Sequence, residues 1–597
     1  MSETKIKFSK IFWPSLIAAL IVSIVGTLIF ILGLGGLIGS LANFEKEPIA
    51  NSDNTILHLT LNGQIAEKGS KKFDKGSFSI ENKIGLSDLL YAFKNAEKDE
   101  HIKGIFLEIE DVQCGYATAR EIRKAINEFE KSGKFAIAYN SGEVITQKEY
   151  YIASAANTNY AFPTSTMEFI GIGAELMFFK NTFEKLEIEM QVIRGSNNDF
   201  KSAVEPFFRE NMSDSSRLQI ETYINGMWSD IRNDISIDRK LTSQKLNEIA
   251  ENVLIHRAND AVAYKLIDGV KYRDEIIELL HKKIGLNQEE EIELVSFEKY
   301  AKEKFLNNQT IIQTEEPNIA VILAEGDIST NGNGLTSENI CKLFQDARKN
   351  KSIKTVVFRI NSPGGSALAS DEIWREVKLT NAKKKVIVSM GDVAASGGYY
   401  IAAPAESIFA EPTTITGSIG VFGMIPYIGK MLENKLGLTF DRAASNSHTV
   451  LTLNKKLTDY ELAIIQNEVN DIYAQFLSRV AEGRGMTTKQ VNVVARGRVW
   501  TGRDALKIGL VDQLGGIDDA INYAAKKAKI KDKKILYYPK LKKEKFEDIL
   551  EALEDGENST EASSKISDDL MQFYNKVKHL ENYSGIQMRL PYEITIN

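Results

Sequence analysis

Ser396 lies in a sequence context that suits a hydrolytic nucleophile. It is the centre of Ala-Ala-Ser-Gly-Gly, residues 394–398, between a strand-like run at residues 386–390 and a helix that we expect to start around Ala394. Backbone N–H groups at a helix start favour negative charge, and the two glycines let a substrate backbone approach closely. The alternative interpretation is a helix N-cap serine with a packing glycine pair.

Residues 361–365, Asn-Ser-Pro-Gly-Gly, form a second glycine-rich turn one strand–helix unit earlier. A proline followed by two glycines turns the chain sharply and exposes successive backbone amides. An oxyanion hole needs such fixed N–H donors beside the nucleophile, and we predict the amides of Gly364 and Gly397 for this role. A turn that needs glycine only for its dihedral angles is the alternative, and the nearby serine favours the functional interpretation.

A serine hydroxyl is a poor nucleophile until a base removes its proton. Lys201 is the stronger base that the sequence offers, because its neighbours are mostly apolar and burial lowers a lysine pKa from about 10.4. Asp199 and Glu205 would oppose this shift if they lay close. Ser418, in Thr-Gly-Ser-Ile-Gly at residues 416–420, is suited to orient a neutral amine, with stabilisation of a turn as the alternative.

His448 is the other base to consider, because histidine is the usual partner of a serine nucleophile. It lies two positions from the residue aligned with Lys201, within a polar, loop-like stretch at residues 444–449. Such surroundings are typical of a solvated surface histidine. No aspartate is placed by spacing to orient its ring, although Asp441 stays open as a partner.

The serine and the lysine belong to two copies of one module. Tyr-Tyr-Ile-Ala occurs twice, at an offset of 399 − 150 = 249. The segments that the two copies share are residues 55–61 and 318–324, 150–153 and 399–402, and 260–268 and 504–512. At the offset of 249, Ser396 aligns with Gln147, and Lys201 aligns with Val450. One copy has the serine and the other has the lysine, so we predict a single catalytic site assembled from both.

Short β-branched runs alternate with helical segments in the chain. Residues 355–358 and 385–388 are such runs, and residues 370–379 form a helical segment between them. This βαβ order indicates parallel strands with helical crossovers. We therefore predict an α/β fold with two tandem repeats.

The bulk composition excludes several classes of function. A chain of 597 residues is too long for a single core, and its 43% apolar and 26% charged residues are ordinary for a globular protein. The net charge of 74 − 81 = −7 leaves no basic footprint, so no nucleic-acid partner is expected. Cys114 and Cys341 lie far apart, which argues against a disulfide framework. The sequence has no CxxC or HExxH motif, so neither a metal nor another cofactor is predicted.

Residues 11–42 are predicted to form a transmembrane anchor. Residues 11–44 contain no charged side chain, and residues 16–38 alone supply the roughly 20 apolar residues of a membrane-spanning helix. Lysines precede this segment and glutamates follow it, which places the N-terminus in the cytoplasm and the body across the membrane. A signal peptide cleaved at residues 40–42 is the alternative, but the apolar run exceeds the ~7–15 residues of a signal core.

Four motifs together resemble those of the bacterial signal peptide peptidase A (protease IV) family, in its large tandem-repeat form. They are residues 200–206, 361–365, 394–399 and 416–420. The resemblance runs from the anchor to about residue 530. It implies a fold of the Clp protease and enoyl-CoA hydratase (crotonase) type in each repeat.

The same resemblance implies roles for individual residues. Its nucleophile is Ser396, its general base Lys201, its oxyanion donors Gly364 and Gly397, and its lysine-orienting residue Ser418. It also implies a homotetramer in the inner (cytoplasmic) membrane, with its catalytic body on the periplasmic side, that degrades released signal peptides and other apolar peptides. Asp392 departs from the family pattern, because it adds a charge near the site that would bear on substrate preference.

The predicted organisation has six parts. They are residues 1–10 in the cytoplasm, the anchor at 11–42, the first repeat at 50–285 with the lysine, a connection at 286–316, the second repeat at 317–540 with the serine, and a charged tail at 541–597. For the tail we expect helices and loops and assign no chemistry. Two other functions stay open, a crotonase-like acyl-CoA enzyme, since glycine-rich oxyanion loops also suit thioester enolates, and a non-catalytic membrane scaffold.

Overall fold

The structure, a computed structural model, describes residues 54–74, 79–287, 290, 292–314, 316–332, 334–539 and 586–589. The predicted anchor, residues 11–42, lies outside these residues, as does most of the predicted tail. Among the residues that are described, no helix combines the length and the apolar character needed to cross a membrane.

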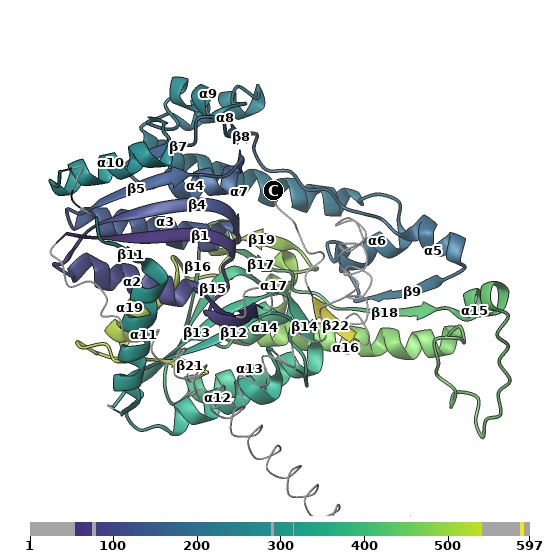
Figure 1. The fold of residues 1–597 in the computed structure, drawn as a ribbon. Coiled ribbons are helices and arrows are strands. Elements are labelled where there is room, and N and C mark those ends of the chain that lie inside the picture. The colour runs from purple at the N-terminus through teal and green to yellow at the C-terminus, as the bar shows by residue number, and fades with distance from the viewer. Residues whose placement is uncertain are drawn as a thin grey trace, which may run out of the picture. The chain divides into compact units, whose positions relative to one another are not determined.

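The first repeat is built on a parallel sheet of six strands in the order β10-β7-β5-β4-β1-β11 (Figure 1). The strands are β1 (Thr55–Gln64), β4 (Ile102–Gln113), β5 (Phe135–Asn140), β7 (Thr158–Ala161), β10 (Gly269–Val270) and β11 (Leu294–Ser296). The helices that connect them include α2 (Leu86–Lys98), α3 (Tyr116–Lys131), α4 (Gln147–Ala153) and α10 (Arg273–Ile284).

The second repeat has the same alternation around a sheet of eight strands. The path across it is β19-β17-β15-β13-β12-β21, and β16 joins β15 and β20 at its side. The strands are β12 (Ile319–Glu325), β13 (Thr355–Ser362), β15 (Val386–Ala395), β16 (Ser407–Ala410), β17 (Ile415–Gly417), β19 (Val499–Thr501), β20 (Gln513–Leu514) and β21 (Ile535–Tyr538). Its helices include α12 (Ser337–Lys349), α13 (Ala367–Asn381), α14 (Gly397–Ala402) and α19 (Ile517–Lys527). The predicted α/β alternation is confirmed.

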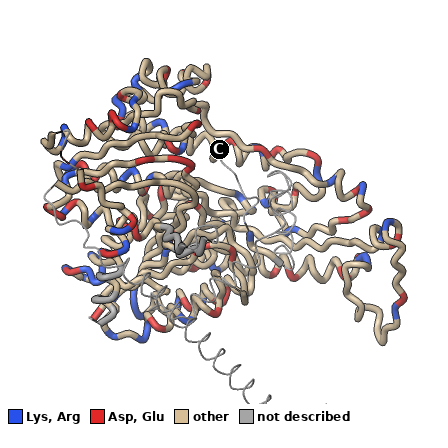
Figure 2. The backbone as a smooth tube through the Cα atoms, in the orientation of Figure 1, with Lys and Arg blue, Asp and Glu red and all other residues tan. Residues whose placement is uncertain are grey.

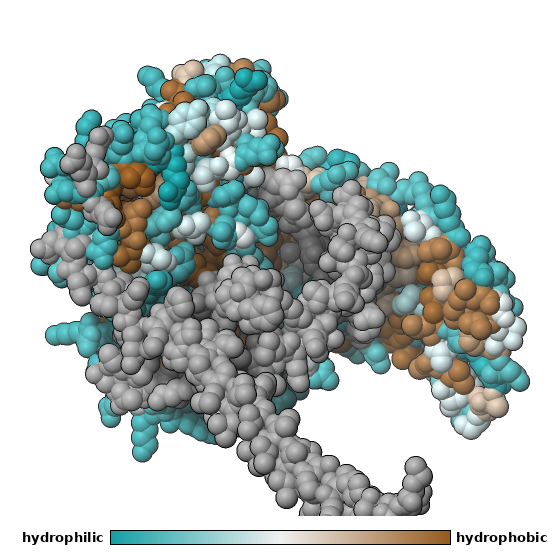
Figure 3. Space-filling view, in the orientation of Figure 1, coloured by the Kyte–Doolittle hydropathy of each residue, from teal (hydrophilic) through white to brown (hydrophobic). Residues whose placement is uncertain are grey.

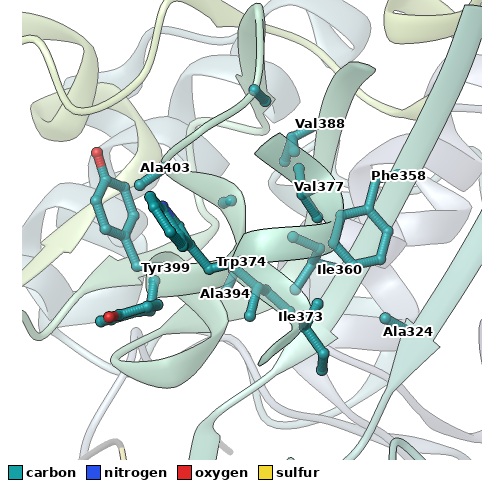
Figure 4. Close-up of a cluster of buried hydrophobic side chains, with 14 of the residues drawn as sticks. Ala324, Phe358, Ile360, Ile373, Trp374, Val377, Val388, Ala394, Tyr399 and Ala403 are labelled. Atoms are coloured by element: carbon teal, nitrogen blue, oxygen red, sulfur yellow. The ribbon is translucent and has the colours of Figure 1, made fainter. Parts of the chain in front are cut away.

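Burial explains why the apolar runs of the second repeat form central strands. In β12, residues 319–324 read Ile-Ala-Val-Ile-Leu-Ala and all six are buried, as a parallel strand covered on both faces requires. Figure 4 shows Ile373 and Val377 of α13 beside Phe358 and Ile360 of β13, within one hydrophobic cluster. This packed core fixes the ends of β13 and β15, after which Gly364 and Ser396 lie.

A buried ion cluster joins the two repeats. Arg359 of β13 is fully buried and contacts two carboxylates of the first repeat, Glu67 Oε2 at 2.9 Å and Glu121 Oε1 at 2.6 Å. Strand β9 (Glu189–Arg194) of the first repeat also pairs antiparallel with β18 (Phe422–Tyr427) of the second. Figure 2 shows that acidic and basic residues elsewhere are interspersed along both repeats.

Three segments differ from the sequence-based expectation. Ala394 and Ala395 pair with β17, so β15 continues to Ala395 and the helix α14 begins only at Gly397. The predicted connection contains β11, which extends the first sheet, and α11 (Phe297–Thr314). Within the predicted tail, β22 (Ile586–Arg589) is a strand, so the expectation of helices and loops is wrong there. The strands that flank β22 come from distant parts of the sequence, which local patterns do not reveal.

Candidate active site at the junction of the two repeats

Ser396 lies between the end of β15 and the start of α14 in a strained backbone conformation. Its φ of 55° and ψ of −113° are unusual for a residue with a side chain, and such conformations cost about 1–3 kcal/mol. The Ser396 N–H donates to the Gly417 carbonyl oxygen at 2.8 Å, and the Tyr400 N–H donates to the Ser396 carbonyl oxygen at 2.9 Å. The surroundings therefore hold the turn, as they do at many functional sites.

Lys201 enters the site from the first repeat, just before the short 3-10 turn η1 (Ser202–Val204). Two glycines of the second repeat make room for it. A Cβ on Gly497, whose φ is +80°, would lie 2.5 Å from the Lys201 Cβ, and a Cβ on Gly420 would lie 3.2 Å from the Lys201 Cδ. Close approach and positive φ together require glycine at position 497.

The lysine meets two serines of the second repeat in the buried interior. Lys201 Nζ lies 2.8 Å from Ser396 Oγ, 3.0 Å from Ser418 Oγ and 3.1 Å from the Ser418 carbonyl oxygen. All three residues are fully buried. The structure thus brings together three predicted site residues within one chain, although Lys201 and Ser396 are 195 positions apart.

Burial lowers the pKa of the Lys201 amine well below its ordinary value of 10.5. The two nearby acidic residues that could oppose this effect have other partners. Asp199 pairs with Arg496, and Glu205 accepts hydrogen bonds from the Ser213 N–H at 3.0 Å and the Ser213 hydroxyl at 2.6 Å. Desolvation without a compensating negative charge favours the neutral form of a lysine.

The predicted oxyanion donors are neighbours. A Cβ on Gly364 would lie 2.8 Å from the Gly397 nitrogen, so the two backbones touch. The Gly364 N–H donates to the Ser362 hydroxyl at 3.2 Å within its own turn. A Cβ on Gly364 would overlap the carbonyl oxygen of Met588 from β22, and a Cβ on Gly397 would lie 3.1 Å from it. A peptide carbonyl therefore already lies against both glycines.

His448 lies apart from this cluster. Its Nδ1 is 3.0 Å from Glu461 Oε1, and its side chain is 47% exposed. This placement matches the surface histidine that its polar context predicted. Its hydrogen-bond partner is Glu461 rather than Ser396.

In the first repeat, residues other than serine occupy the positions that align with Ser396 and Ser418. Gln147 begins α4 and is buried; its side-chain oxygen accepts the Gly171 N–H at 2.8 Å, and its amide donates to the Tyr116 hydroxyl at 3.4 Å. Phe169, aligned with Ser418 at the same offset, is fully buried. At these two positions the first repeat therefore keeps the framework but no serine, and its lysine comes from elsewhere in the repeat.

Asp392, whose charge was expected to bear on substrate preference, caps a helix of the first repeat. Its carboxylate accepts the N–H of Gly115 at 3.1 Å, the N–H of Thr118 at 2.8 Å and the Thr118 hydroxyl at 2.7 Å. Gly115 is the N-cap of α3 and has no side chain to satisfy these donors. An aspartate of the second repeat therefore caps a helix of the first.

Sequence reasoning missed three contributors to the site, Gly497, Gln219 and Met588. Gln219, on helix α7 (Asp214–Arg239), donates to the Phe200 carbonyl at 3.1 Å and to the Ser202 hydroxyl at 2.8 Å, which fixes the chain on both sides of the lysine. Nothing in the local sequence distinguishes this glutamine from others on helices. Gly497, between two arginines, was the one available signal, since an isolated glycine often marks close backbone approach.

Comparison with known proteins shows which family this chain belongs to. The family model described as Peptidase family S49 matches residues 128–287 and 378–531, and the Clp protease model matches residues 320–414. The chain belongs to peptidase family S49. It is 33% identical over 489 residues to the chloroplastic serine protease SPPA of Arabidopsis thaliana, which covers 80% of this chain and 69% of that protein.

Two bacterial relatives are similar over comparable lengths. Protease 4 of Salmonella typhi is 32% identical over 515 residues, with coverage of 82% of this chain and 81% of that protein. Protease 4 of Haemophilus influenzae is 30% identical over 518 residues, with coverage of 83% and 82%.

Membership of the S49 family makes this chain a serine peptidase, a hydrolase. The two matched segments fall on the two repeats, so the predicted tandem organisation is confirmed. The Clp protease match covers the start of the second repeat and confirms the predicted type of fold there. The sequence left two alternatives open, an acyl-CoA enzyme and a non-catalytic scaffold. Neither of them explains why the chain belongs to a peptidase family.

Proposed function

We propose that Ser396 and Lys201 form the catalytic dyad of a serine endopeptidase. The contact of 2.8 Å between Nζ and Oγ is the observation that carries the proposal. A neutral amine has two N–H groups and one lone pair. The carbonyl and hydroxyl oxygens of Ser418, at 3.1 Å and 3.0 Å, suit the two N–H groups. The lone pair is then left to accept the Ser396 hydroxyl proton, as a general base must.

Each proton in the proposed reaction has a defined path. Lys201 takes the hydroxyl proton while Ser396 Oγ attacks the scissile carbonyl carbon and forms a tetrahedral intermediate. The amides of Gly364 and Gly397 stabilise the negative oxygen. The ammonium group then gives its proton to the leaving amine. The neutral lysine next activates water, which releases the acyl group and restores Ser396.

We further propose that the enzyme is anchored in the inner membrane and acts on released signal peptides and other apolar peptides. The uncharged residues 11–44, preceded by lysines and followed by glutamates, support an anchor with a cytoplasmic N-terminus and a catalytic body on the periplasmic side. The similarity to proteins named SPPA and Protease 4 supports a peptidase of this kind. An anchored site lies close to apolar peptides that remain in the bilayer.

Association into a homotetramer is part of the proposal, and an exposed apolar region supports it. The helices α5 (Lys180–Leu186) and α15 (Gly429–Leu436) lie at one side of the fold with strands β9 and β18 (Figure 1). Exposed apolar side chains there include Leu436 at 63%, Leu438 at 49%, Leu451 at 64% and Leu453 at 49%. Figure 3 shows hydrophobic residues gathered over this part of the surface. Such patches on soluble surfaces mark interaction sites.

Two alanine variants test the dyad. Ser396→Ala and Lys201→Ala should each lower kcat/KM for an apolar signal-sequence peptide by at least about a thousandfold, while circular dichroism stays that of the wild type. Ser445→Ala and Lys489→Ala are matched controls, because both residues are exposed. A purified Lys201→Ala protein that retains more than a tenth of wild-type activity would reject the lysine as the base.

A further inference from the structure

Residues 496–499 of the second repeat contact both the chain beside Lys201 and the turn that contains Ser418. Three backbone hydrogen bonds make these contacts, from the Phe200 N–H to the Arg496 carbonyl oxygen at 3.0 Å, from the Ser418 N–H to the Arg498 carbonyl oxygen at 2.7 Å and from the Gly497 N–H to the Ile419 carbonyl oxygen at 2.8 Å. The base and its orienting serine are therefore aligned against one short stretch of backbone.

A fourth contact with this stretch is made by a side chain, that of Gln219 on helix α7. Its amide oxygen accepts the Val499 N–H at 3.1 Å, while its amide nitrogen donates to the Phe200 carbonyl oxygen at 3.1 Å and to the Ser202 hydroxyl at 2.8 Å. Both N–H groups of the amide are thus used. Gln219 is 1% exposed, so water does not compete for these bonds. One amide ties both neighbours of Lys201 to the second repeat.

Val499 extends this connection to the nucleophile. It begins β19, which pairs antiparallel with β17, and there it faces Gly417. The Gly417 carbonyl oxygen accepts the Ser396 N–H at 2.8 Å, and Gly417 directly precedes Ser418. A path of two hydrogen bonds and one strand pairing therefore joins Gln219 to both serines of the site.

The dyad needs such a connection because its two members belong to different repeats. The Lys201 amine bonds to Ser396 and Ser418, which lie 195 and 217 positions away in the sequence. The distance between the amine and the hydroxyl is therefore set by how the two repeats are held together beside the lysine. A general base acts within about 2.6–3.2 Å of the atom whose proton it takes, and a misplacement of about 1 Å can lower a rate roughly a hundredfold.

We propose that Gln219 is a positioning residue, which holds the base of one repeat against the nucleophile of the other. The inference rests on the proposed dyad and adds a residue that acts through Lys201. Its three hydrogen bonds go to Phe200, Ser202 and Val499, so its effect reaches the reaction through the lysine. A residue that only anchored helix α7 would support folding without any influence on how the lysine titrates.

Gln219→Leu in the full chain tests the proposal, because leucine fills similar space and makes none of the three bonds. A loosened amine gains contact with water, so the pKa of Lys201 should rise toward 10.5. The acid limb of the kcat/KM profile should then move up by about one pH unit. At pH 7, kcat for an apolar signal-sequence peptide should fall roughly a hundredfold, and KM should stay within about twofold of the wild type.

Gln309 supplies a matched control. It lies on α11 and is also 1% exposed, and its amide donates to the Ile535 carbonyl oxygen at 2.9 Å and accepts the Tyr537 N–H at 3.0 Å. Both glutamines thus join a helix to a strand, but β21 lies at the opposite edge of the sheet from β17 and β19. Gln309→Leu should lower the unfolding midpoint as Gln219→Leu does, and its kcat and acid limb should keep wild-type values.

Two further variants make the test robust. Gln219→Glu keeps the shape of the side chain and an oxygen for Val499, and its charge favours the charged form of the lysine, so its acid limb should also move up. This variant decides the question if Gln219→Leu does not fold. Gln219→Leu combined with Ser418→Ala should lower kcat by less than the product of the two single effects, because both act on one amine.

The contrary results separate this proposal from the dyad. An unmoved acid limb in Gln219→Leu or Gln219→Glu, an equal loss of kcat in Gln309→Leu, or a full product in the double variant would overturn the positioning role. The dyad would stand in each case, since Ser396→Ala and Lys201→Ala test it separately. Wild-type activity in Lys201→Ala would overturn both proposals.

Discussion

Replacing Lys201 with methionine should stabilise the protein at pH 7 while it abolishes activity. Methionine has a similar length but carries no proton that burial must remove. To deprotonate a lysine with the ordinary pKa of 10.5 at pH 7 costs about 5 kcal/mol, since each pH unit corresponds to about 1.4 kcal/mol. The variant loses three hydrogen bonds, each worth about 1 kcal/mol. The net gain in the free energy of unfolding is therefore about 2 kcal/mol at pH 7.

The pH dependence of this gain has a definite sign. Burial lowers the pKa of Lys201 in the folded protein, so between that pKa and 10.5 the unfolded chain binds one more proton. Stability of the wild type therefore rises with pH in this window. Lys201→Met has no such group, so its advantage should shrink by about 1.4 kcal/mol per pH unit between pH 7 and pH 9.

The assay compares thermal unfolding midpoints of the variant and the wild type at pH 7, 8 and 9. Each kcal/mol corresponds to a difference of roughly 1 °C for a chain of this size. Lys507→Met is the control, because the Lys507 side chain is 66% exposed, and its difference from the wild type should not change with pH. A difference for Lys201→Met that also stays constant from pH 7 to pH 9 would refute a neutral lysine.

Three further predictions concern the parts that support the dyad. Ser418→Ala removes one hydrogen bond to Lys201 and should lower kcat roughly tenfold to a hundredfold in steady-state assays; an unchanged kcat would deny Ser418 a positioning role. Gly497→Ala should inactivate the enzyme by displacing Lys201, whereas Gly437→Ala, also at positive φ but with open space around its Cβ position, should keep its activity; equal activities would contradict the close approach. Arg359→Met should lower the free energy of unfolding by about 3–5 kcal/mol in denaturant titrations because it leaves Glu67 and Glu121 unpaired, and Glu67→Gln with Glu121→Gln should recover most of this loss.

The sequence predicted which residues meet at the candidate site better than it predicted what surrounds them. The repeat offset paired Ser396 with Gln147 and Lys201 with Val450, and this complementarity needed no coordinates. The α/β alternation followed from the spacing of β-branched runs. Both signals are local or periodic, which is the kind of information that a single sequence carries.

Features that depend on contacts between distant segments could not be read in the same way. The carboxylate of Asp392 caps helix α3 of the other repeat, a contact that the sequence did not predict. Gly497 is required because the Lys201 backbone passes beside it, a constraint set about 300 residues away in sequence. Strand β22 forms only because β14 (Gly364–Ser366) and β18 present edges on both sides of it, so its own four residues gave no strand signal.

Active-site labelling reports whether an uncharged Lys201 activates Ser396. A peptidyl fluorophosphonate, followed by peptide mapping, should give one adduct per chain, on Ser396. The labelling rate should rise with pH until Lys201 is fully neutral, and Lys201→Ala should be labelled at least about a thousandfold more slowly. An adduct on another residue would exclude Ser396 as the nucleophile, and labelling of Ser396 at the wild-type rate in Lys201→Ala would exclude Lys201 as its base.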